Sequence, residues 1–66
     1  MKLQDFLELP IEEQAAYYLG HIKVTKFNLS SMIWEERLRT AIERDCPQAL
    51  IPFPQLAEVY KYIKHG

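Results

Sequence analysis

Hydrophobic residues recur with helical spacing over residues 10–22. At about 100° per residue, one face of a helix collects the apolar side chains Ile11, Ala15, Tyr18, Leu19 and Ile22. The opposite face carries Glu13, Gln14 and Tyr17. Pro10 suits the first position of a helix, where its missing N–H costs nothing. Because Ile22 is still in phase, we expect this helix to end between Gly20 and Lys23, with Gly20 either as its C-terminal cap or as an exposed weak point.

A second amphipathic pattern predicts a helix over residues 29–45. Its buried stripe consists of Trp34, Leu38, Ala41 and Ile42, and its outer face carries Glu35, Arg39 and Glu43 at i,i+4 spacing. Two positions are possible for the start of this helix. Asn28 as N-cap would pair Phe27 with Met32 as a hydrophobic staple, whereas Ser30 as N-cap would pair Leu29 with Trp34. Pro47 disfavours helical geometry at the preceding Cys46, so the helix should stop near Asp45.

Two shorter helices complete the pattern. Residues 2–8 place Leu3, Phe6 and Leu7 on one face, and residues 54–64 form a final stripe of Leu56, Val59, Tyr60 and Ile63. One helical turn is expected around residues 48–50. The sequence therefore predicts an all-α fold, a compact bundle of three to four short helices at about 2–8, 10–22, 29–45 and 54–64, in a single domain of residues 1–66.

Residues 21–28 have no helical rhythm, and two interpretations compete for them. Ile22 and Val24 alternate with His21, Lys23 and Thr25, as in a strand. No other segment offers a partner strand, and an unpaired strand leaves backbone groups unsatisfied. We therefore expect a connector between helices, with a strand exchanged with another chain as the alternative.

Composition limits the function classes. The chain has 66 residues, of which 48% are hydrophobic and 26% charged, and this balance predicts a globular fold. A net charge of −1 supplies no strong phosphate-binding field. The first residues lack the features of a secretory signal, and no apolar run reaches the roughly 18 residues of a membrane span. We expect a cytoplasmic protein that does not enter the membrane.

The residue types that carry catalysis are not arranged for it. His21 lacks an acidic or thiol neighbour at an orienting spacing, and His65 is the penultimate residue. Cys46 is the single cysteine, so neither a disulfide nor a paired-cysteine metal site is expected. Adjacent carboxylates, as at residues 12–13 and 35–36, point about 100° apart on a helix and cannot share a proton. We predict no enzyme activity, no cofactor and no metal.

Recognition of nucleic acid is the weaker of two binding hypotheses. The interval from His21 to Phe27 is about twice the three-to-four-residue turn of a helix-turn-helix motif. The following helix also begins with two carboxylates, at residues 35–36, that would face phosphate. The hypothesis that stays open is a dimeric nucleic-acid-associated regulator that uses Lys23, Lys26, Arg37 and Arg44.

The leading hypothesis is a small non-enzymatic protein-binding module: an adaptor, an inhibitor or a regulatory subunit, of the kind that phages and other mobile elements carry. Aromatic residues make up 12% of the chain, and several side chains of types favoured at interfaces lie off the apolar stripes. The candidate partner-binding residues are Tyr17, His21, Lys23, Lys26, Met32 and Tyr62. Packing within a small bundle is the competing explanation for the off-stripe residues Tyr17, Met32 and Tyr62.

Two further expectations concern the connector and the assembly. Ile22 and Phe27 should turn inward, while His21, Lys23 and Lys26 stay exposed, with the two lysines steering an acidic partner. A core near the lower size limit, with no disulfide or metal to support it, favours a homodimer.

Overall fold

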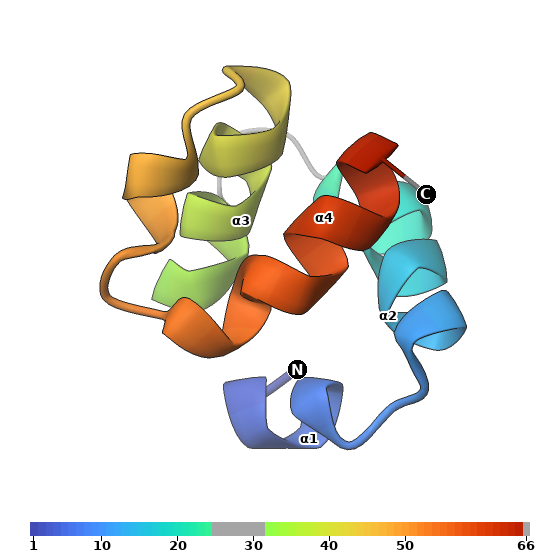
Figure 1. The fold of residues 1–66 in the computed structure, drawn as a ribbon. Coiled ribbons are helices and arrows are strands. Elements are labelled where there is room, and N and C mark those ends of the chain that lie inside the picture. Colours follow the sequence, from blue (N-terminus) through green and yellow to red (C-terminus); the bar gives the residue numbers. More distant parts are fainter. Residues whose placement is uncertain (25–31, 66) are drawn as a thin grey trace.

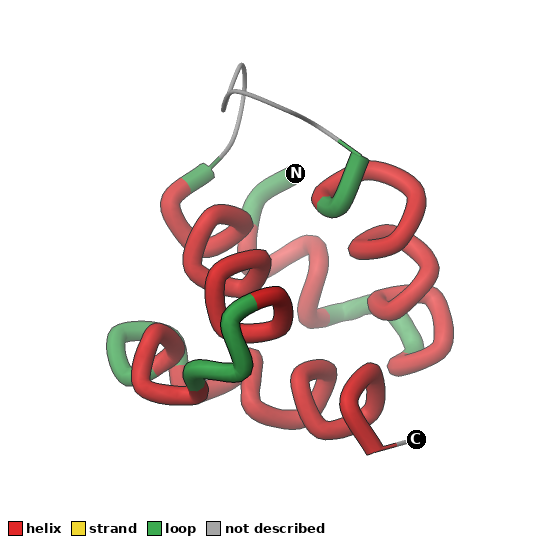
Figure 2. Tube along the Cα trace, turned by 90° about the horizontal axis from the view of Figure 1, so that it is seen from above, coloured by secondary structure: helices red, strands yellow, loops and turns green. Residues whose placement is uncertain are grey.

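A computed structural model describes residues 1–24 and 32–65, and every regular element in these two ranges is helical (Figures 1 and 2). Four α-helices are present in the described chain: α1 (Leu3–Leu7), α2 (Ile11–Tyr17), α3 (Ile33–Glu43) and α4 (Ala57–His65). Three short turns join them: a π-helical turn η1 (Tyr18–Ile22) and two 3₁₀ turns, η2 (Pro47–Leu50) and η3 (Pro54–Leu56). The predicted all-α class is confirmed, as is the helical turn around residues 48–50.

Helix α4 packs against both α2 and α3, and η2 packs against α3. In Figure 1, α4 crosses the front of the molecule between α2 and α3, and α1 lies below them. Both pairings of α4 join segments that are far apart in sequence, so α2, α3 and α4 pack together as one unit.

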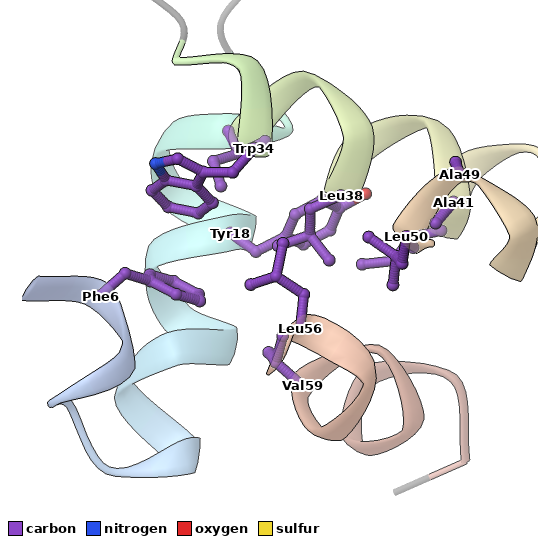
Figure 3. Packing of buried hydrophobic residues seen from close by; sticks show 11 residues of the cluster. Phe6, Tyr18, Trp34, Leu38, Ala41, Ala49, Leu50, Leu56 and Val59 are labelled. Carbon is purple, nitrogen blue, oxygen red and sulfur yellow. The ribbon is translucent and has the colours of Figure 1, made fainter. Parts of the chain in front are cut away.

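The core is built from α1, α3, α4 and the turns η1, η2 and η3, and Ile11 and Tyr17 of α2 pack against it (Figure 3). Its buried members are Phe6, Tyr18, Ile22, Trp34, Leu38, Ala41, Ile42, Ala49, Leu50, Leu56 and Val59. The predicted stripe of α3 is buried in full. In the other stripes the central residues are buried, and the outer ones, such as Tyr60 and Ile63, are half-buried against the cluster.

The predicted faces of α2 need two corrections. Gln14 was expected outside but is buried, because its side-chain amide donates to the Leu9 carbonyl (2.9 Å) in the link from α1 and is thereby satisfied. Leu19 was expected inside but is exposed. It lies in η1, where the N–H of Lys23 donates to the Tyr18 carbonyl five residues earlier (2.7 Å). This wider turn ends at Ile22, within the predicted limits.

Gly20 is an exposed position within η1 and not a left-handed cap, since it does not have a positive φ. The described part of the 21–28 segment is the end of η1 followed by a turn at residues 23–24, so the strand interpretation is wrong there. Residues 25–28 lie outside the described ranges.

Helix α3 begins at Ile33, later than either predicted start, and both predicted starts are wrong. The two predicted caps, Asn28 and Ser30, and the staple residue Phe27 lie outside the described residues. The observed N-cap is Met32, whose backbone N–H donates to the Glu35 carboxylate (3.2 Å). Glu35, at the third position of the helix, thereby supplies the carboxylate half of a capping box.

The C-terminus of α3 uses a left-handed residue, and its place near Asp45 confirms the prediction. Asp45 has φ of 54°, and the N–H of Cys46 donates to the Ala41 carbonyl (2.9 Å), which is the 6→1 bond of a Schellman motif. Tyr60 donates to the Asp45 carboxylate (3.2 Å), and Lys64 forms an ion pair with it (3.4 Å). These contacts fasten α4 to the end of α3.

Candidate protein-binding surface

The described candidate residues fall into three places. His21, Lys23 and Met32 border the 25–31 segment and are exposed. Tyr62 is exposed on α4, whereas Tyr17 is half-buried between helices. Lys26 lies outside the described residues. The exposure of His21 and Lys23 and the burial of Ile22 confirm that part of the connector prediction.

We define the connector surface as His21, Lys23, Val24, Met32 and Ile33. It contains three of the seven large hydrophobic residues that are exposed in the described chain. Val24 and Ile33 have 64% and 68% of their surface exposed, which is high for β-branched aliphatic side chains. Neither residue was among those predicted from the sequence to bind a partner. Ile33 carried a signal, because it is an apolar residue on the helix face that it shares with Arg37 and Arg44.

A buried carboxylate lies under this surface. Only 2% of Glu35 is exposed, and its oxygens accept from the Tyr17 hydroxyl (2.8 Å) and the Met32 N–H (3.2 Å). The amino group of Met1 lies 3.6 Å from the same carboxylate. Glu35 was predicted on the outer face of α3, and this prediction is wrong because these three partners replace the water that a buried carboxylate loses.

An aromatic cluster adjoins this carboxylate through Tyr17. The rings of Tyr17 and His21 are stacked, with centroids 5.0 Å apart and planes at 26°. Tyr17 also contacts Phe6 (5.7 Å), and Phe6 contacts Trp34 (4.7 Å). Packing therefore accounts for the position of Tyr17 off the apolar stripe. Its role in partner binding stays a prediction.

Arg39 connects α3 to the end of η1. Its Nε and Nη2 atoms both donate to the Ile22 carbonyl, at 3.0 and 2.6 Å. Arg39 was predicted on the outer face with Glu35 and Glu43, but it is half-buried because it satisfies a carbonyl at a helix end. The connector surface is thus anchored on both sides, by Arg39 at η1 and by Glu35 at α3.

The electrostatics of the cluster act on Tyr17. Desolvation, together with the hydrogen bond to Glu35 and the negative charge of Glu35, raises the pKa of its hydroxyl to about 12. At neutral pH the hydroxyl is protonated, as it must be to donate to Glu35. The pKa of Tyr18 is also raised, first by desolvation and then by the charge of Glu43, while Arg39 lowers it.

A second candidate surface is a shallow groove between α2 and α4. It has a volume of about 560 Å³ and is lined by Ile11, Glu58, Lys61, Tyr62 and His65. Tyr62, at 39% exposed, is its only aromatic residue.

The residue types that could bind a metal, react as a nucleophile or bind phosphate are spread over the described surface. Within residues 1–24 and 32–65, no three His, Cys, Asp or Glu residues come together as a metal site would require. The Cys46 thiol donates to the Gln48 side-chain oxygen (3.3 Å). Arg37 is exposed on α3 and Arg44 at the C-cap of this helix, and Glu36 and Glu43 are exposed on the neighbouring face. None of the helices described has the length and apolar character needed to cross a bilayer.

Comparisons with protein-family models, curated proteins and solved structures found no significant match to this chain.

Proposed function

We propose that the chain is a small cytoplasmic protein-binding module, an adaptor, inhibitor or regulatory subunit, and that it binds its protein partner through the connector surface. The observation that carries this proposal is the exposure of Val24, Met32 and Ile33 on the two sides of the 25–31 segment. Protein interfaces commonly have apolar residues at their centre and polar residues at their rim. His21 and Lys23 supply such a rim.

The charges beside the apolar residues favour an acidic partner. Arg37 lies within about 40° of Ile33 around the axis of α3, and Arg44 follows at the C-cap of this helix, so the cations extend the face on which Ile33 is exposed. Lys23 adds a cation at the end of η1. Such rim charges mainly accelerate and orient the encounter with an oppositely charged surface.

The contacts under the surface support the same function. The Glu35 carboxylate accepts a hydrogen bond from the Met32 N–H, and the Arg39 guanidinium donates to the last carbonyl of η1. Residues fixed before association lose less conformational entropy on binding. The bordering residues are thus suited to serve as anchors.

A matched pair of isoleucine variants tests the proposal. Ile33 and Ile51 are similarly exposed, at 68% and 73%, but only Ile33 lies on the connector surface. The tagged wild-type chain is used to isolate its partner from the cells that make it, and the purified partner is then titrated against Ile33→Ser and Ile51→Ser. We expect Ile33→Ser to weaken binding about tenfold or more, as for a central interface residue, with Ile51→Ser close to wild type. Equal affinities of the two variants would contradict the use of this surface.

The alternative function is a dimeric nucleic-acid-associated regulator that uses Lys23, Lys26, Arg37 and Arg44. The exposure of Arg37 on α3 and of Arg44 at its C-cap favours this alternative, while the nearby Glu36 and Glu43 weaken the positive field there. Fluorescence anisotropy with labelled duplex DNA tests it. Tight binding that falls steeply with salt and is lost in Arg37→Glu would favour the alternative over the protein-binding module.

A further inference from the structure

The outward face of α4 carries a short stripe that is complementary to itself. Its members are spaced i, i+3, i+4 and i+7 and are all exposed: Glu58, Lys61, Tyr62 and His65. The opposite face of the helix supplies Val59 to the core. The stripe lines the groove beside Ile11, so one exposed aromatic ring shares this groove with one acidic side chain, one lysine and one histidine.

The charged groups of this stripe have no partner within residues 1–24 and 32–65. Neither an ion pair nor a hydrogen bond joins the side chains of Glu58, Lys61 or His65 to other described residues. Lys64 on the same helix differs, because it contacts Asp45 and the Ile42 carbonyl. The charges of the stripe are therefore available to a second molecule.

We propose that a second copy of this chain occupies the groove, with the two α4 helices antiparallel across a two-fold axis between Lys61 and Tyr62. In this register Glu58 faces the partner's His65. Lys61 faces the partner's Tyr62, where an ammonium group over a tyrosine ring is favourable. Two-fold symmetry makes each contact twice. A parallel pair would instead place Glu58 against the partner's Glu58, so the order of charges selects the antiparallel arrangement.

This dimer is independent of the proposed function because it uses a different face of the molecule. One exposed helix face is smaller than a standard interface of about 800 Å² per partner, so we expect weak, reversible association. The connector surface is left open in the dimer. Ile33→Ser should therefore leave the dimer unchanged, and loss of the dimer should not by itself abolish partner binding.

Sedimentation velocity over a concentration series tests the proposal with two complementary variants. Wild type should show a dimer that grows with concentration. Glu58→Lys removes the acidic partner of His65, and His65→Glu places two carboxylates opposite each other, so each should shift the dissociation constant upward by about tenfold or more. An equimolar mixture of the two variants should recover the dimer, since Lys at position 58 then faces Glu at position 65 of the other chain.

Glu36→Lys is the matched control, since it makes the same charge change on an exposed residue of α3. It should dimerise like wild type, and circular dichroism melting of every variant confirms that it is folded. A wild-type chain that stays monomeric at all concentrations would overturn the proposal, and so would Glu58→Lys dimerising as well as Glu36→Lys. Failure of the mixture to recover the dimer would overturn the antiparallel register.

Discussion

Removing the Tyr17 hydroxyl should destabilise the protein more than the loss of one oxygen atom suggests. Tyr17→Phe keeps the ring that packs on Phe6 and His21, and it deletes only the donor to the buried Glu35 carboxylate. A hydrogen bond to a charged group contributes about 1.5–3 kcal/mol, and here its loss leaves a buried acceptor with fewer partners. We expect the free energy of unfolding at pH 7 to fall by about 1.5–3 kcal/mol.

The same contact makes a prediction at alkaline pH. The pKa of Tyr17 is about 12 in the folded protein, whereas an unperturbed tyrosine has a pKa near 10. As the pH rises above about 10, the unfolded chain loses the Tyr17 proton first, so the stability that this group contributes is present below pH 10 and is lost up to about pH 12. Tyr17→Phe has no hydroxyl at this position to titrate. The difference in free energy of unfolding between wild type and variant should therefore become smaller from about pH 10 to about pH 12.

Urea denaturation followed by the fluorescence of Trp34, the one tryptophan, measures both effects. The other tyrosines titrate in both proteins and cancel in the comparison. Tyr62→Phe is the control, because its hydroxyl makes no hydrogen bond in the described chain, and it should change stability by less than about 0.5 kcal/mol. If Tyr17→Phe is as stable as Tyr62→Phe at pH 7, or if its deficit is unchanged from pH 8 to pH 12, the account of the Glu35 cluster is refuted.

Further predictions concern packing, turns and rim charge. Leu38→Ala, at a fully buried core position, should cost about 2–5 kcal/mol in urea denaturation. Asp45 has a positive φ, so Asp45→Gly should be more stable than Asp45→Ala by about 1 kcal/mol in the free energy of unfolding, measured in the same assay. This order is the reverse of the helix propensities of Gly and Ala. Gly20→Ala should raise stability by about 0.4–1 kcal/mol and the thermal midpoint with it, since no atom lies within 4 Å of the added Cβ. Lys23→Glu should leave the melting temperature nearly unchanged, while stopped-flow measurements show slower association with an acidic partner and a weaker dependence on salt.

The core of the fold was predictable because burial follows helical phase. Trp34, Leu38 and Ala41 recur at the spacing that places them on one side of α3, and all three are buried. Glu35 could not be predicted in the same way. Its burial depends on Tyr17, which is 18 residues away in sequence, and helical spacing carries no information about such a contact.

The start of α3 and part of the candidate surface were missed for different physical reasons. Sequence rules look for Ser, Thr, Asp or Asn at an N-cap, whereas here Met32 holds that position and Glu35 receives its backbone N–H. At the surface, His21 and Lys23 were identified as exposed from their place between helical patterns. Val24 was missed because an exposed β-branched residue has the same sequence signal as a buried one.

Site-specific photo-crosslinking in the cells that make this protein tests binding through the connector surface most directly. A photoreactive amino acid at position 33 should give one discrete adduct with the partner on irradiation, while the same amino acid at the equally exposed position 51 should give none. Both variants must first melt like wild type. An adduct formed from position 51 and not from position 33 would contradict the account, and so would a partner that is captured intact but never crosslinks from position 33.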